Sequence, residues 1–172
     1  ESSFARFSDI LASLEGQQTF GDVIYRKRLA ELAVARSNSA DALIRYGDVI
    51  GPILAELGPH HPEVVSAFLQ GAEVLLDMGL LSFVDTTLSY FDSLHGDELG
   101  QRIVTATGVQ MVKGRLAMAR GDFATAERLL RGALNKRIDA FGANASSLGE
   151  CYTVLGNLYA AQNRQDEVIH AR

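Results

Sequence analysis

The side chains that most often perform chemistry are few in this 172-residue chain, which has four histidines and a single cysteine. His60 and His61 are adjacent, so their side chains point apart and lack the spacing of a metal-binding pair on a helix. His95 and His170 lie far along the chain from both. We interpret His60 and His61 as polar residues of a link between two elements, and no metal site is expected.

Cys151 is the other candidate for chemistry. Near the start of a helix its thiolate would be favoured, because the positive end of the helix lowers a thiol pKa. However, no histidine lies near Cys151 in the sequence to serve as its base. We interpret Cys151 as a small packing residue. A lone cysteine also forms no internal disulfide, which fits a reducing compartment, and we expect a cytoplasmic protein.

Catalysis is not expected elsewhere in the chain. The glycines form no phosphate-binding loop, because none of their clusters follows a strand-like segment. No nucleophile, base and orienting residue converge in the sequence, so the chain is predicted not to be an enzyme and to need no cofactor.

Composition limits the class of partner. The net charge of −5 argues against a general nucleic-acid surface, which would be basic. No run of 18 apolar residues exists, so no membrane span is expected. With 47% hydrophobic and 22% charged residues, the chain has the composition of one folded domain. It starts without Met and stops in the first turns of an expected helix, so we expect a fragment of a larger protein.

A 42-residue repeat organises the sequence. One series at this interval consists of Gly16, Gly58, Gly100 and Gly142, and another of Ala42, Val84, Ala126 and Val168. Self-similarity at such a period is typical of a solenoid, in which like units stack side by side. A third series of small residues is Ala30, Ala72, Gly114 and Gly156. Small residues let helices approach closely, so we expect Ala126 to contact the neighbouring helix near Gly114.

The elements that carry these residues have helical rather than strand periodicity. The expected helices are a leading helix at 3–15, pairs at 20–36 and 39–57, 62–78 and 81–95, and 103–120 and 123–141, a helix at 146–162, and the start of another from 165. They form repeats at about 20–57, 62–98, 103–141 and a truncated 146–172, within one domain of residues 1–172. Gly51 and Pro52 predict a kink or break near Asp48 to Pro52.

Two stretches resemble tetratricopeptide repeats, namely residues 114–134 (GRLAMARGDFATAERLLRGAL) and 155–159 (LGNLY). The resemblance covers the chain from about residue 20 and is strong in the third and fourth repeats. The repeat length and the link at 57–62 (LGPHHP) are similar to the longer repeats of kinesin light chains and of many bacterial regulatory proteins. The resemblance implies an all-α, right-handed superhelical solenoid of antiparallel helix pairs.

The resemblance also implies a concave groove lined by the first helix of each pair. It places there Lys27, Glu31 and Val34 from the first pair, Leu69, Glu73 and Leu76 from the second, Met111, Arg115 and Met118 from the third, and Thr153, Asn157 and Ala160 from the fourth. The i, i+7 spacing of the two leucines and of the two methionines gives each helix an apolar stripe. Such a stripe is either a partly exposed site for a peptide or helix, or a core seam against a neighbouring helix.

The second helix of the third repeat has a basic surface, with Arg128, Arg131, Lys136 and Arg137 outnumbering Glu127 and Asp139. A solvated convex face is the usual meaning of such a run, and docking against an acidic partner is the alternative.

These observations predict a scaffold that binds a peptide or helix of a partner protein in its concave groove. The alternative is a regulatory segment of a bacterial signalling protein, such as a kinase or transcription regulator, that senses a small ligand or peptide. Neither function requires a metal, a cofactor, nucleic acid or a membrane.

Overall fold

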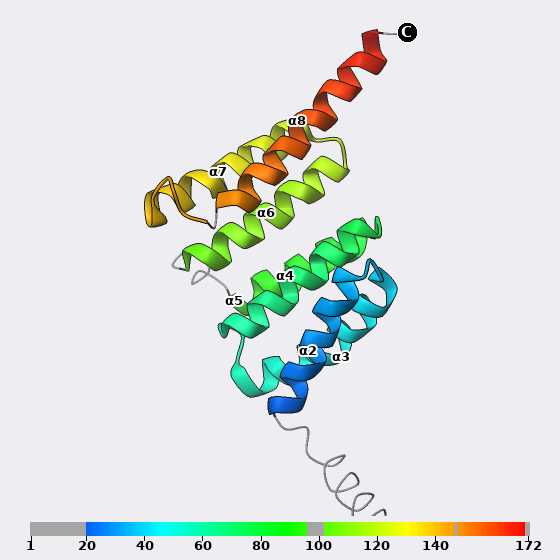
Figure 1. Ribbon diagram of the computed structural model, residues 1–172, viewed down its shortest axis with the longest axis vertical. Coiled ribbons are helices and arrows are strands. Elements are labelled where there is room, and N and C mark those ends of the chain that lie inside the picture. The colour runs from blue at the N-terminus through cyan, green and yellow to red at the C-terminus, as the bar shows by residue number, and fades with distance from the viewer. Residues whose placement is uncertain (1–19, 96–101, 147, 171–172) are drawn as a thin grey trace, which may run out of the picture. The chain divides into compact units, whose positions relative to one another are not determined.

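The computed structural model describes residues 20–95, 102–146 and 148–170, and all regular structure in these residues is α-helical. The helices are α2 (Phe20–Ala35), α3 (Ser39–Leu57), α4 (Pro62–Asp77), α5 (Leu81–His95), α6 (Ile103–Ala119), α7 (Phe123–Phe141) and α8 (Leu148–His170) (Figure 1). The all-α class is therefore confirmed for the described residues. The leading helix expected at 3–15 lies outside them.

The helices from α2 to α7 begin and end within one residue of the predicted positions, because local signals determine their ends. Asn38 Oδ1 accepts a hydrogen bond from the backbone N of Asp41 at 3.2 Å, and Asp122 Oδ1 accepts one from Thr125 N at 3.0 Å. Both bonds satisfy backbone donors that the first turn of a helix leaves free. After α3 the chain turns through Gly58 at φ 76°, a conformation that glycine adopts without strain.

Pro52 lies inside α3, which continues without interruption to Leu57. The predicted break is therefore wrong, while a bend within the continuous helix stays a prediction. Pro52 cannot donate to the carbonyl of Asp48, but Asp48 is exposed, so water can satisfy that carbonyl.

The end of the chain differs more from the prediction. A turn is expected at Asn163 and Arg164 with a new helix from 165, but α8 runs on from Leu148 to His170. Two of the observed turns between paired helices contain a glycine at positive φ, Gly79 at 71° and Gly121 at 78°. The turn between α2 and α3 has no glycine and uses Ser37 at φ 57° instead. Asn163 and Arg164 form no such turn and lie within α8.

The described residues fall into two compact units divided between Ala67 and Phe68, which we call unit 1 (up to residue 67) and unit 2 (from residue 68), where the sequence predicts a single repeat domain. In unit 1, α2 packs against α3. Its buried core side chains are Ala30, Ala33, Ala42, Tyr46, Val49, Ile53, Val64, Val65 and Ala67. The spacing of those in α3 confirms that its buried face follows helical periodicity.

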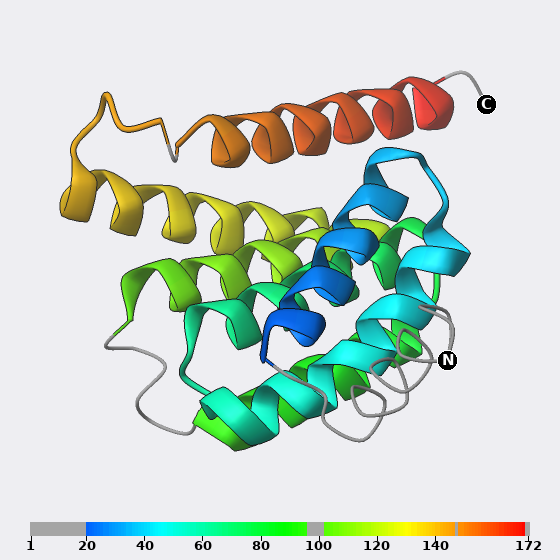
Figure 2. The same ribbon diagram turned by 60° about the horizontal axis from the view of Figure 1, so that its bottom comes forward.

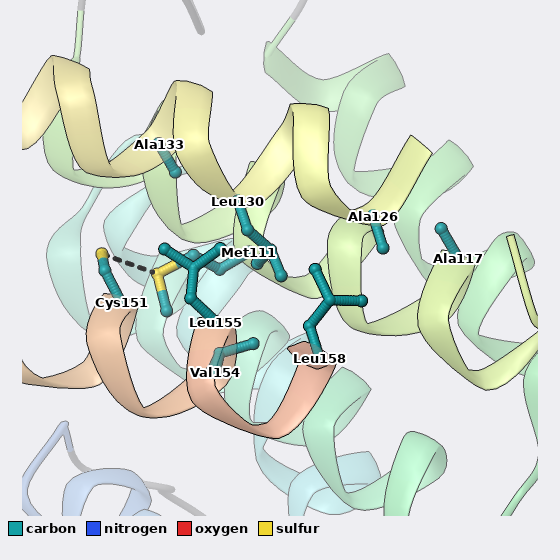
Figure 3. Close-up of a cluster of buried hydrophobic side chains, with 9 residues drawn as sticks. All are labelled: Met111, Ala117, Ala126, Leu130, Ala133, Cys151, Val154, Leu155 and Leu158. Atoms are coloured by element: carbon teal, nitrogen blue, oxygen red, sulfur yellow. Dashed lines mark hydrogen bonds between the residues drawn. The ribbon is translucent and has the colours of Figure 1, made fainter. Parts of the chain in front are cut away.

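In unit 2, α6 packs most extensively against α7, and α7 also packs against α8 (Figure 2). The shared core of these three helices consists of Met111, Ala117, Ala126, Leu130, Ala133, Cys151, Val154, Leu155 and Leu158 (Figure 3). The expected contact between Ala126 and Gly114 is confirmed. A Cβ added at Gly114 would lie 3.5 Å from the carbonyl oxygen of Ala126 and 2.8 Å from Leu130 Cγ and Cδ2.

Candidate functional site

Lys27 and Glu31, the candidate residues of unit 1, belong to a charge cluster with little exposure. Lys27 is only 2% exposed. Its Nζ lies 3.3 Å from Glu31 Oε1, pairs with Glu63, and donates to Ser66 Oγ at 3.2 Å. Two carboxylates thus neutralise this lysine inside the unit, as a buried charge requires. The placement of Lys27 on an open surface is wrong, whereas Val34 is exposed.

Arg115 of α6 is held by carboxylates of α4 within unit 2. Its guanidinium pairs with Glu73, and its Nη2 lies 3.0 Å from Asp77 Oδ1. Burial lowers the pKa of Arg115 from its usual value. The Glu73 and Arg115 pair is therefore formed between the helices, and Arg115 already has two anionic partners before any ligand arrives.

The leucine stripe of α4 is half-buried at Leu69 and Leu76. Leu69 Cδ1 occupies the space beside Gly108 of α6, lying 2.7 Å from where a Cβ would stand on that glycine. Leu69 therefore contributes to the α4–α6 contact of unit 2, which favours the core-seam interpretation for this residue.

The methionine stripe of α6 is buried at Met111 and partly exposed at Met118. Met111 is 3% exposed and lies in the shared core, where its sulfur accepts a hydrogen bond from the Cys151 thiol at 3.6 Å (Figure 3). Met118 is half-buried against the same cluster. The expected exposure is thus wrong at Met111, because α8 packs over this side of α6, and an i, i+7 stripe is common to core seams and exposed sites.

The candidate residues of α8 are exposed. Thr153, Asn157 and Ala160 all face solvent in unit 2, and the Thr153 hydroxyl donates only within its own helix, to the Gly149 carbonyl at 2.9 Å. Tyr152 is 53% exposed beside them. Together these residues form a continuous strip that we call the α8 open face, consisting of Gly149, Tyr152, Thr153, Gly156, Asn157 and Ala160.

Gly156 is the residue of the α8 open face whose importance the tertiary structure reveals. A Cβ added at Gly156 would meet nothing within 4 Å. In the 42-residue repeat, Gly156 corresponds to Gly114, which is buried beneath Ala126 and Leu130 of α7. The repeat was the sequence signal for this position, but it carried no information on whether a helix covers it.

The basic run of α7 is mostly exposed, at Arg128, Arg131 and Lys136. Arg137 is an exception, since it is 7% exposed, and its placement on a solvated face is wrong. Its Nε donates to Thr107 Oγ1 at 3.0 Å and its Nη1 lies 3.2 Å from Glu150 Oε2. Arg137 therefore connects α7 to α6 and to α8.

No group of three or more His, Cys, Asp or Glu side chains within residues 20–95, 102–146 and 148–170 is arranged to hold a metal ion. His95 is buried, stacks on Phe91 with ring centroids 3.9 Å apart, and has its Nδ1 2.8 Å from the Phe91 carbonyl. Cys151 is 1% exposed, and burial raises the pKa of its thiol. The interpretation of Cys151 as a packing residue is confirmed. The raised pKa disfavours the thiolate, so Cys151 is not an activated nucleophile.

No family model matches the chain. No curated protein matches it either. Among the described residues, no helix is both long enough and apolar enough to cross a membrane.

Proposed function

We propose that this chain is a tetratricopeptide-like repeat protein, a right-handed superhelical solenoid of antiparallel helix pairs, whose function is to bind a helix or peptide of a partner protein. The observation that supports this proposal most directly is the α8 open face. It presents small residues and an exposed tyrosine, and Gly156 lies there with open space around it.

The internal repeat indicates what kind of partner suits this face. At the equivalent position of α6, Gly114 receives the backbone of Ala126 and the side chain of Leu130, which lie four residues apart on α7. A partner helix with a small residue and a leucine at this spacing would therefore fit against Gly156 in the same way. Such close helix packing needs a residue without a side chain at the crossing.

The rest of the α8 open face has properties of a partner site. Tyr152 supplies an aromatic side chain of the type enriched at interaction hot spots. Thr153 and Asn157, the expected groove residues of this helix, border Gly156 and offer hydrogen bonds. Since Met111, Arg115 and Lys27 are already engaged inside their units, we propose that α8 carries the partner contact.

The test uses the full chain and a synthetic peptide of residues 122–142, the segment whose helix covers Gly114. Fluorescence anisotropy should show saturable binding, and labelling the chain with 15N should show amide shifts concentrated on the exposed side of α8. Gly156→Leu should weaken binding by at least about tenfold, because the new side chain keeps the helix at a distance.

Gly132→Leu is the matched control, since Gly132 of α7 also has nothing within 4 Å of an added Cβ. It should leave binding unchanged. Failure of the unmodified chain to bind the peptide, or equal binding by Gly156→Leu, would overturn the proposal.

A second candidate is a ligand-sensing regulatory segment of a bacterial signalling protein. One observation favours it, a pocket between α5, α6 and α7 within unit 2.

A further inference from the structure

The turns from α2 to α3, from α4 to α5 and from α6 to α7 have the same geometry at the same position of the 42-residue repeat. A residue with positive φ stands in each of them, at Ser37, Gly79 and Gly121, with φ angles of 57°, 71° and 78°. The backbone N of the next residue donates to the carbonyl five positions back at 2.9, 2.9 and 3.0 Å, from Asn38 to Ala33, from Leu80 to Leu75 and from Asp122 to Ala117. A left-handed residue followed by this bond is the Schellman arrangement, which ends a helix.

Asn163 occupies the fourth position of this series, inside α8. After glycine, asparagine is among the residues that most readily take the left-handed conformation, because its short polar side chain bonds to nearby backbone. The Asn163 side chain is exposed, so no core contact opposes a turn there. Asn163 therefore retains the capacity to end a helix, although α8 runs through it in the structure.

Two further series of the repeat show which positions these turns bring into the core. One series follows the turns and is 0% exposed at Ala42, Val84 and Ala126. The other precedes the turns and is buried at Ala30, Ala72 and Gly114. The fourth members are Val168 and Gly156, and Gly156 is exposed, with nothing within 4 Å of an added Cβ. Gly156 thus lacks the cover that the other members of its series have.

We propose that α8 has a second state, in which it ends at Asn163 and residues 165–170 turn back onto the α8 open face. Val168 then lies against Gly156, as Ala126 lies against Gly114 in the structure. The straight α8 leaves the face free for a partner helix, whereas the folded-back segment occupies it. Residues 165–170 are thus an internal competitor for the partner, and this regulatory role rests on the proposed function.

Disulfide trapping in the full chain detects the second state. In a straight helix the Cα atoms of residues 156 and 168 are about 18 Å apart, at a rise of about 1.5 Å per residue. A disulfide needs Cα atoms within about 7 Å of each other. The variant Cys151→Ala, Gly156→Cys, Val168→Cys should therefore form an internal disulfide only by folding back. Mass spectrometry detects the product as a monomer that has lost two hydrogens.

The variant Cys151→Ala, Gly149→Cys, Ala161→Cys is the matched control. Its two cysteines have the same separation along the chain, but both lie before Asn163 and stay on a straight helix in either state. This pair should form no internal disulfide. Equal cross-linking of the two pairs, or no cross-linking of residues 156 and 168, would overturn the proposal.

Two substitutions at Asn163 connect the turn to partner binding. Asn163→Gly favours the left-handed turn, and Asn163→Ala favours the straight helix. Cross-linking of residues 156 and 168 should be at least about fivefold faster with Asn163→Gly than with Asn163→Ala. In the chain without introduced cysteines, Asn163→Ala should bind the peptide of residues 122–142 more tightly than Asn163→Gly, because its open face is free more of the time.

Equal peptide affinities of the two Asn163 variants would overturn the regulatory role. Absence of peptide binding by both variants and by the unmodified chain would instead overturn the proposed function. In that case cross-linking of residues 156 and 168 still decides whether the second state exists.

Discussion

Gly114 and Gly156 occupy the same position of the 42-residue repeat and have opposite surroundings. Gly114 lies against Leu130 and the backbone of Ala126, whereas a Cβ on Gly156 would meet nothing within 4 Å. The same residue therefore allows a helix crossing in α6 and forms part of an open surface in α8. The difference shows that a small residue permits close helix packing, and that such packing occurs only where a neighbouring helix lies against that residue.

The two sides of α8 repeat this contrast within one helix. Cys151, Leu155 and Leu158 point into the core that α8 shares with α6 and α7 (Figure 3). The opposite side, with Tyr152 and Gly156, is exposed. A helix that is covered on one side only is placed to accept a second helix on the other.

The largest change in stability should come from replacing Gly114, the glycine covered by α7, with a large residue. Gly114→Leu places a side chain where Leu130 already lies, and we expect overpacking to destabilise unit 2 by about 3 kcal/mol. The denaturant midpoint, followed by circular dichroism, measures this loss. Gly156→Leu is the matched variant and should not lower the midpoint, because a Cβ at Gly156 meets nothing within 4 Å. Equal losses in the two variants would mean that the Gly156 surroundings are not open.

A smaller effect is expected when the reactivity of a cysteine is compared between the buried and the exposed side of α8. Burial raises the pKa of Cys151 above its ordinary value of 9.0, so little thiolate forms at pH 8. The unmodified chain should react with a thiol reagent at least about tenfold more slowly than the variant Cys151→Ala, Gly156→Cys. Rates read from the absorbance of the released group check this, and rapid labelling of the unmodified chain would contradict the burial of Cys151.

The raised pKa of Cys151 also has a consequence for stability. The thiol keeps its proton in the folded chain at a pH where the unfolded chain releases it, so folding loses stability as the pH rises through 9.0. The variant Cys151→Ala provides the reference, since it lacks this dependence.

The smallest effect should be a gain in stability. Gly156→Ala adds a methyl group that meets no neighbour and removes the backbone entropy cost of glycine in a helix. We expect stabilisation by about 0.5–1 kcal/mol, seen as a higher thermal midpoint. A lower midpoint would show that the face is packed against something in the folded chain.

Features with a local cause could be predicted from the sequence. Asp122 caps α7 with a hydrogen bond to a residue three positions on, and Gly58 takes a backbone angle that suits glycine. The continuation of α8 differs from the prediction, because the repeat predicts a turn at Asn163 and Arg164 and the helix runs through both residues. Repeat position alone therefore does not determine where a helix ends.

Features that depend on distant residues could not be predicted in the same way. Met111 and Met118 have the spacing of an exposed stripe and equally that of a core seam, and α8 decides between them by covering Met111. The burial of Lys27 likewise depends on Glu63, which lies 36 residues along the chain.

The sequence by itself determined the helical class, the ends of most helices and the equivalence of Gly114 with Gly156, because hydrogen bonds and backbone angles within a few residues encode these. Only the tertiary structure decided which of the two glycines is covered and which charges are already paired. Exposure depends on which helix packs alongside, and residues on another helix, distant in the sequence, settle that.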